Sequence, residues 1–378
     1  MLKRFWFQVH WLLGISAGLV LAVMGATGGL YAFADDILGL LNPAITQVSA
    51  AGGAALPPAE LLARIKLNRP YVSSLSLSGS ATDAARLGFM LPVAGSEQKK
   101  FELQYVNPYT GQLLGKPRGE DFFRFVLDLH RKLALGDTGK AVTGASALVL
   151  VFMCLSGLYL RWPKKNAWHW RLWLTLDAKR SGRGWLSELH AVSATWLLLM
   201  LLLAALTGLY WSYGWYRGWV GNLAAPAPYK QVQGVPKTAV GNASAAGAPA
   251  EPNLAAVWQT FRTEVADYRK LIMLLPSRPG QAVQILYVDS QAPHRYANSK
   301  LLLDAQTGAI QKHEHYTEQA AGARLLASVY ALHSGSYWGV AGMLMMMLAS
   351  LALPGFAVTG WLMYLARRKE KSRTSMPS

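Results

Sequence analysis

The chain is poor in cysteine: Cys154 is the only one among 378 residues. A single cysteine excludes an intramolecular disulfide, a cysteine-ligated iron–sulfur cluster and the CxxCH motif that attaches haem covalently. The sequence also has no GxGxxG segment after a strand pattern, so it predicts no dinucleotide-binding domain. Any redox cofactor must therefore be held by ligands other than thiolates, and it must receive electrons from outside the chain.

Charged residues are also scarce. They make up 15% of the chain, against 52% hydrophobic residues, and they leave four long runs without any charge. A helix needs about 20 mainly apolar residues to cross the core of a bilayer. The runs predict four membrane-spanning helices, over residues 9–34, 141–161, 189–212 and 339–366. The first run is too long for the apolar part of a signal peptide, so we expect it to be retained.

The distribution of basic residues predicts the orientation. Residues 1–8, 161–189 and 367–378 hold 14 of the 37 Lys and Arg residues in about 49 positions, about three times the density elsewhere outside the membrane. By the positive-inside rule, we expect a cytoplasmic loop over 162–188, a cytoplasmic tail over 367–378 and a cytoplasmic N-terminus. The net charge of +17 is then partly a topology signal. The cytoplasmic segments are too short for a nucleic-acid-binding domain, so membrane lipid, not nucleic acid, is the expected partner.

The two segments on the other side, 35–140 and 213–338, follow one plan. Each has a helix, then short partly alternating runs, then a turn that contains Thr-Gly. The helices are expected over 57–67 and 254–268, and the strands over 72–77, 87–92, 101–106, 271–275, 282–288 and 300–303. This pattern predicts two α+β lobes, each with an antiparallel sheet. Residues 224–253, rich in Ala, Pro and Gly, read as a linker within the second segment.

Four of the eight histidines stand at matched distances from a repeated Thr/Ser-Gly motif. The distance is 17 residues from His10 to Thr27 and from His190 to Thr207, and 26 residues from His130 to Ser156 and from His333 to Thr359. The shared spacing predicts a duplicated two-helix unit. It also predicts one pair per membrane face: His10 with His190 on the cytoplasmic side, and His130 with His333 on the outer side.

Paired histidines at membrane depth are suited to bind a haem iron. Two axial imidazoles give a six-coordinate iron that transfers electrons. We therefore expect two haems of the b type, with iron ligands His10, His190, His130 and His333. Glycines on the first helix, including Gly14, Gly18, Gly25, Gly28 and Gly29, would either leave room for a porphyrin or let helices pack closely. For the histidines, the alternative is an interfacial role without a cofactor.

The other histidines carry weaker patterns. His169 lies in a Trp- and Arg-rich segment typical of a membrane-surface anchor. His294 belongs to a loop, and His313 and His315 to an exposed strand or loop, with metal binding as the less favoured alternative. Cys154 is expected to serve packing.

Several motifs resemble those of the PepSY-associated transmembrane proteins, also called iron-regulated membrane proteins. They are His10-Trp11 near the start, Leu129-His130-Arg131, Leu155-Ser156-Gly157-Leu158-Tyr159, Leu189-His190, Leu206-Thr207-Gly208-Leu209-Tyr210-Trp211 and Leu332-His333-Ser334-Gly335. Within the family, the chain is most similar to inner-membrane siderophore reductases of the ferrioxamine B type. The resemblance implies a multi-pass protein of a bacterial inner membrane, with periplasmic PepSY-like lobes.

It further implies that electrons pass through haem to a ferric siderophore, with a hydroxamate as the expected type. The donor would be a quinol or a cytoplasmic reductase. Two alternatives stay open. The lobes could be a binding or regulatory module with a membrane anchor, because PepSY lobes are associated with peptidase inhibition. The chain could also be a two-haem oxidoreductase with another acceptor. Ser334 follows His333 and Ala191 follows His190, with no Arg as at Arg131, which makes the members of each pair chemically unequal.

Overall fold

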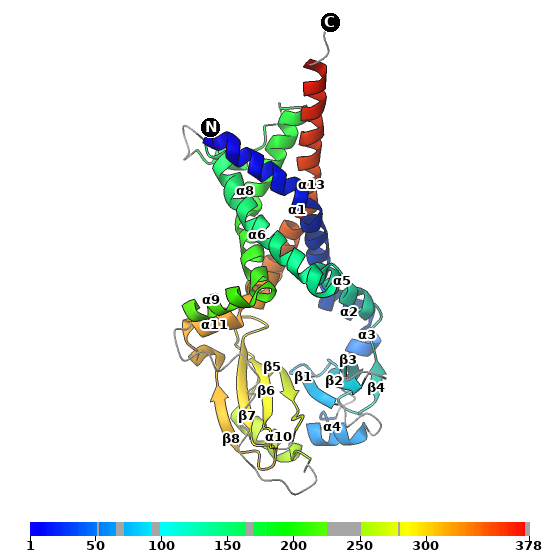
Figure 1. Ribbon diagram of the computed structural model, residues 1–378. Coiled ribbons are helices and arrows are strands. Elements are labelled where there is room, and N and C mark those ends of the chain that lie inside the picture. Colours follow the sequence, from blue (N-terminus) through cyan, green and yellow to red (C-terminus); the bar gives the residue numbers. More distant parts are fainter. Residues whose placement is uncertain are drawn as a thin grey trace. The chain divides into compact units, whose positions relative to one another are not determined.

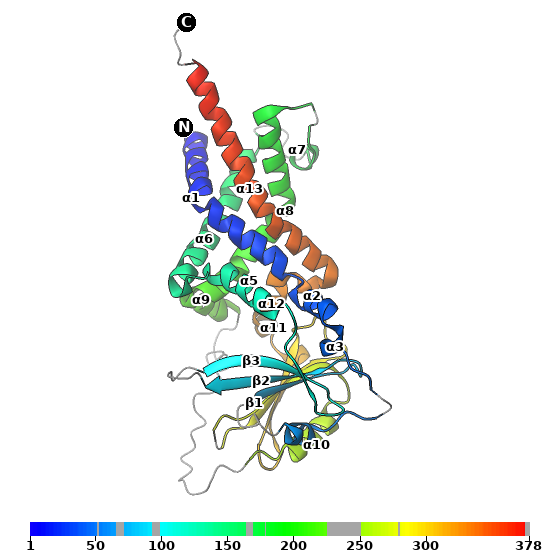
Figure 2. The same ribbon diagram turned by 90° about the vertical axis from the view of Figure 1, so that its right-hand side faces the viewer.

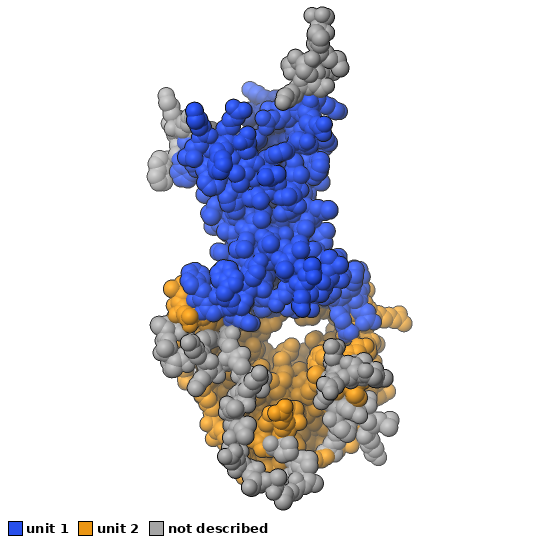
Figure 3. Space-filling model, in the orientation of Figure 1, with its two compact units in different colours: residues 1–34, 121–220, 329–378 blue, residues 35–120, 221–328 orange. Residues whose placement is uncertain are grey.

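The protein forms two compact units in the computed structural model (Figures 1 and 3). The helical unit comprises residues 1–34, 121–220 and 329–378, and the sheet unit comprises residues 35–120 and 221–328. The structure describes residues 1–50, 53–65, 72–92, 99–163, 169–177, 179–224, 251–278 and 280–374. Most of the expected linker over 224–253 lies outside the described residues.

Four long helices make up most of the helical unit: α1 (Leu2–Tyr31), α6 (Gly136–Arg161), α8 (Gly182–Ser212) and α13 (Gly339–Thr374). In the described residues, these four are long and apolar enough to cross a membrane, as the uncharged runs predict. They pack in a closed ring, since α1 contacts α6 and α13, and α8 contacts the same two helices. The start of α1 and the end of α13 lie at the same end of the unit (Figure 1), as an even number of spans requires.

Close packing of α1 against α13 depends on two glycines (Figure 2). A Cβ at Gly25 would lie 2.3 Å from the carbonyl oxygen of Ser350, and a Cβ at Gly29 would lie 2.7 Å from Cγ of Leu351. Small residues at such positions let two helix backbones approach in a membrane. Gly25 and Gly29 therefore serve helix packing, one of the two roles expected for the glycines of this helix.

Two short helices complete the bundle at the end opposite the chain termini, namely α5 (Glu120–Lys132) and α12 (Val329–Ser334). Helix α5 is amphipathic and buries Phe123 and Val126. The structure assigns α5 and α12 to the helical unit, although the sequence places them at the ends of the segments 35–140 and 213–338. The physical reason is that both helices bury apolar side chains, and each carries one of the paired histidines.

The sheet unit contains one antiparallel sheet, eight-stranded in the described part of the chain, with the order β4-β3-β2-β1-β5-β6-β7-β8. The strands are β1 (Val72–Ser78), β2 (Ala85–Pro92), β3 (Lys99–Val106), β4 (Leu113–Gly115), β5 (Tyr268–Leu274), β6 (Val283–Asp289), β7 (Asn298–Leu303) and β8 (Ile310–Glu314). The sequence predicts a sheet for each lobe. The structure instead joins the two halves through β1 and β5, which pair Leu75 with Met273 and Ser76 with Ile272.

Each half contributes one helix to the same core, α4 (Pro58–Arg64) and α10 (Leu254–Glu264). Their buried side chains Leu61 and Phe261 pack with Leu75, Leu271 and other alternate strand residues. Figure 2 shows α10 against one face of the sheet. The remaining elements are α2 (Ala34–Leu41), α3 (Pro43–Thr46), α7 (Arg171–Leu174), α9 (Gly214–Ala224), η3 (Tyr316–Glu318), α11 (Ala321–Ala327) and η4 (Ser336–Trp338).

The two expected Thr-Gly turns form by the same mechanism. The side-chain oxygen of Asn107 accepts hydrogen bonds from the backbone N–H groups of Tyr109 and Thr110, and Asp304 makes the same contacts to Gln306 and Thr307. Such side chains favour turns because they satisfy the turn's own backbone donors. The glycines that follow, Gly111 and Gly308, have φ of 76° and 71°, where a side chain would be strained.

The shared core predicts that both halves of the sheet lose stability together. Leu75 is fully buried on the central strand β1, so Leu75→Ala should lower the free energy of unfolding by about 2–5 kcal/mol. Pulse proteolysis of the full chain in urea measures the loss. Ser76→Ala, on the opposite face, is the control and should change stability by less than about 0.5 kcal/mol. Independent loss of residues 72–106, with residues 268–314 still protected, would contradict the shared core.

Candidate functional site

The helical unit groups the four spaced histidines into two pairs at its opposite ends. The first pair is His10 of α1 and His190 of α8, at the end that carries the chain termini. The second pair is His130 of α5 and His333 of α12. All four side chains are partly buried among the helices. Each of these histidines therefore keeps some surface that a ligand could contact.

The second pair has a geometry that fits a shared metal ion. The ring centres of His130 and His333 lie 6.3 Å apart, and the ring planes are inclined by 59°. Two imidazoles bound to opposite sides of one metal through bonds of about 2 Å have ring centres about 6 Å apart. The structure thus brings together His130 and His333, the pair expected from the sequence on the outer side.

Burial keeps the imidazoles of the second pair neutral. It lowers the pKa of His130, and it lowers the pKa of His333, with the nearby His130 as a further cause. Because a metal binds the neutral form of the ring, a histidine that stays unprotonated at neutral pH is a competent ligand. Trp211 packs on His333 in a T-shaped arrangement, with ring centres 5.2 Å apart.

In the first pair, each ring is placed by contacts with a neighbouring helix. The His190 ring packs in a T-shaped arrangement on Phe356 of α13, with ring centres 5.0 Å apart. His10 is placed beside α6, where its Cε1 would lie 3.4 Å from a Cβ at Gly157. Each ring of this pair is thus fixed against a different helix of the bundle.

Every one of the four rings contacts a hydroxyl of the repeated motif through Nδ1. The distances are 2.7 Å from His10 to Ser156, 2.7 Å from His190 to Thr359, 2.8 Å from His333 to Thr207 and 3.4 Å from His130 to Thr27. In each case the hydroxyl belongs to another helix of the same half of the chain. With Nδ1 engaged, the ring nitrogen left for a metal is Nε2.

The glycine after the hydroxyl lies next to the ring at three of these contacts, and at Gly28 a Cβ would come too close to the ring. A Cβ would lie 2.8 Å from Cε1 of His130 at Gly28 and 3.6 Å from Cε1 of His333 at Gly208, and Gly157 plays this part for His10. Gly360, next to Thr359, has no such neighbour within 4 Å among the described residues. Sterically, the requirement for glycine is strongest at Gly28.

The sequence predicts the histidines and the motifs but not how they connect. Spacing relates each histidine to a motif farther along the chain, for example His10 to Thr27. The structure connects His10 to Ser156 and His130 to Thr27 instead. A helix of 17 residues is about 25 Å long, so Thr27 lies about one membrane thickness away from His10. Membrane depth is the signal in the sequence that indicates these contacts. Thr27 is expected at the depth of His130, and Ser156 at the depth of His10.

The other four histidines lie elsewhere and have other environments. His169 is exposed. His294 is buried and contacts the hydroxyls of Tyr316 and Ser328. His313 and His315 both contact the hydroxyl of Tyr287. Within the described residues, no group of three or more His, Cys, Asp or Glu side chains is arranged to hold a metal ion.

Cys154 is buried in the core of the bundle, as expected for packing.

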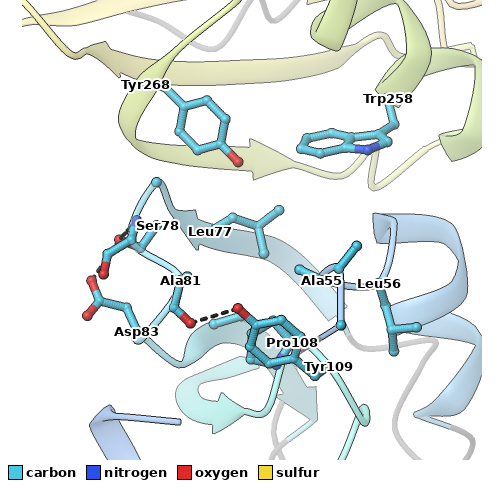
Figure 4. Close-up of a pocket in the computed structure, with 15 residues that line it drawn as sticks. Ala55, Leu56, Leu77, Ser78, Ala81, Asp83, Pro108, Tyr109, Trp258 and Tyr268 are labelled. Carbon is cyan, nitrogen blue, oxygen red and sulfur yellow. Dashed lines mark hydrogen bonds between the residues drawn. The ribbon is translucent and has the colours of Figure 1, made fainter. Parts of the chain in front are cut away.

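The sheet unit has a separate cavity of about 310 Å³ near the turn between β1 and β2. Figure 4 shows Tyr268 and Trp258 on one side of it, and Tyr109 and Pro108 on the other. The Tyr109 hydroxyl donates a hydrogen bond to the carbonyl oxygen of Ala81, at 2.7 Å. The described lining residues include no histidine or basic side chain, so this cavity lacks the ligands that the helical unit offers.

Comparison with known families agrees with this architecture. The sequence model of the PepSY-associated TM region matches residues 7–367, nearly the whole chain. The chain belongs to the PepSY-associated transmembrane family. A comparison with curated proteins finds no match. Membership in the family establishes a multi-pass membrane protein, and the antiparallel sheet unit fits PepSY-like lobes.

The glycine contacts predict a selective effect at the second pair. Gly28→Ala would place a methyl group 2.8 Å from Cε1 of His130, so the ring must move. On the expectation that the two pairs hold two b-type haems, the purified variant should lose one of them, as measured by a pyridine haemochrome assay. Gly360→Ala is the control in the same motif, and it should retain both haems. Equal haem content in both variants and the unmodified protein would contradict this steric account.

Proposed function

We propose that this protein is a two-haem membrane reductase that passes electrons across a bacterial inner membrane and reduces a ferric siderophore in the periplasm. One observation carries the proposal: two histidine pairs lie at opposite ends of the spanning bundle, and the resolved ring separation of 6.3 Å suits axial ligation. His10 and His190 would hold the haem on the cytoplasmic side, and His130 and His333 the haem on the periplasmic side.

The residues fit two b-type haems in three respects. The rings are partly buried, they present Nε2, and three of them lie over a glycine. With a single cysteine, the chain offers no covalent attachment, so axial ligation and packing must hold the group. When bound between two histidines, such a haem supplies one-electron transfer without ready binding of oxygen.

The reaction needs an external donor and no acid–base residue. Each Fe(III) of the chelate takes up one electron and becomes Fe(II), which the siderophore holds less strongly. The electrons come from a quinol or from a cytoplasmic reductase, because the expected cytoplasmic segments are too short to form a flavin or nicotinamide domain. The acceptor is expected to be of the hydroxamate type, on the basis of the resemblance alone.

The matched hydrogen bonds also support a duplicated unit. In the first half, His10 contacts Ser156 and His130 contacts Thr27, and in the second half His190 contacts Thr359 and His333 contacts Thr207. We infer that the two halves repeat one two-helix design, and that each haem site takes one histidine from each half. Neither half alone would then form a complete site.

A second candidate function is supported by the aromatic cavity of the sheet unit. A cavity lined by Trp258, Tyr268 and Tyr109 is of the kind that binds a small ligand. On this alternative, the sheet unit is a binding or regulatory module and the helices are its anchor. A two-haem oxidoreductase with a different acceptor is the remaining alternative. The helical unit favours electron transfer, because a helical membrane anchor would not need four partly buried histidines with hydrogen-bonded ring nitrogens.

Replacement of the histidines distinguishes these functions. The purified protein is expected to show a Soret band and two haems per chain, and each of His10→Ala, His130→Ala, His190→Ala and His333→Ala should lose at least one. His169→Ala is the control and should lose none. The dithionite-reduced protein, mixed anaerobically with a ferric hydroxamate chelate, should be reoxidised as Fe(II) forms. Absence of haem after haem-sufficient expression would disprove electron transfer, whereas bound haem without chelate reduction would indicate another acceptor.

A further inference from the structure

We infer that Ser156, Thr359, Thr27 and Thr207 are positioning residues that fix the tautomer of the histidines, and that the first pair depends on them more than the second. The inference rests on the proposed function, because it concerns how the histidines present Nε2 to a haem iron.

The direction of each hydrogen bond follows from the single proton of a hydroxyl. Thr359 donates to the carbonyl oxygen of Gly355 at 2.8 Å, one turn earlier in its own helix. Ser156 contacts the carbonyl oxygen of Met153 in the same way, at 3.3 Å. Their hydroxyl oxygens are then left as acceptors toward the histidines. The imidazoles of His190 and His10 must therefore carry their proton on Nδ1.

A proton on Nδ1 leaves the lone pair on Nε2. In metal sites, a hydrogen bond donated by the second ring nitrogen fixes the tautomer and ring orientation, and makes the ligand more basic. The repeated motif thus supplies an acceptor from a neighbouring helix for each ring. In the apolar interior of a membrane, it also satisfies a donor that would otherwise be costly to bury.

The second pair has an additional acceptor. Nδ1 of His130 lies 2.8 Å from the carbonyl oxygen of Met24, closer than the 3.4 Å to Thr27. A carbonyl oxygen can only accept. The backbone therefore imposes the same tautomer on His130 even without the Thr27 hydroxyl.

The difference in acceptors predicts which of the two sites depends more on its motif hydroxyls. Among the contacts described, the first pair has only hydroxyl acceptors, so Thr359→Val should remove the acceptor of His190 at almost constant volume. We expect haem affinity at that site to fall about tenfold to a hundredfold, the usual effect of losing such a partner. The midpoint potential of that haem should rise, because a less basic ligand stabilises Fe(III) less. Thr27→Val should change the potential of its haem less, because Met24 remains.

Two further variants exclude a purely structural explanation. Thr359→Ser keeps the hydroxyl and should restore the potential of the unmodified protein. Thr195→Val removes a hydroxyl of α8, the helix of His190, that donates to the carbonyl oxygen of Ala191, and it should change neither potential nor haem content. Spectroelectrochemical titration of the purified full chain measures both potentials, and a haemochrome assay measures occupancy.

The outcomes separate this inference from the proposed function. Two haems with unchanged potentials and occupancy in Thr359→Val would overturn the positioning role and leave the reductase proposal intact. Equal shifts in Thr359→Val and Thr27→Val would overturn the ranking. Absence of haem from the unmodified protein would instead overturn the proposed function, and this inference with it.

Discussion

The hydrogen bond between a histidine Nδ1 and a hydroxyl on a neighbouring helix organises the whole bundle. It connects α1 to α6 through His10 and Ser156, and α8 to α13 through His190 and Thr359. An imidazole buried without a partner would be expensive in an apolar medium. Each motif hydroxyl therefore stabilises the helix pair and also aims the ring. The same kind of contact occurs at both ends of the bundle and in both halves of the chain.

The sequence contains enough information for the spanning helices and the histidine pairs. The four uncharged runs predict α1, α6, α8 and α13, because hydrocarbon excludes charge over a fixed length. The matched spacing predicts that His130 meets His333, which the ring separation supports. In the sheet unit, alternation predicts six of the strands, but it does not predict the short β4 or the polar β8. Neither strand has an apolar face long enough to give a periodic signal.

Other features depend on contacts between distant segments, which no local pattern encodes. The union of both halves in one sheet rests on the pairing of β1 with β5, whose residues are almost 200 positions apart. The contacts of Thr27 with His130, and of His130 with the carbonyl oxygen of Met24, likewise depend on the position of α5 in the bundle. Helix α5 by itself reads as an amphipathic surface helix.

The central claim is that the two histidine pairs each ligate a haem iron from both sides. Low-temperature electron paramagnetic resonance of the oxidised, purified full chain tests it most directly. The account predicts two low-spin ferric signals typical of bis-imidazole coordination, each integrating to one spin per chain. A high-spin ferric signal at either site, or a single low-spin signal at one spin per chain, would contradict the claim.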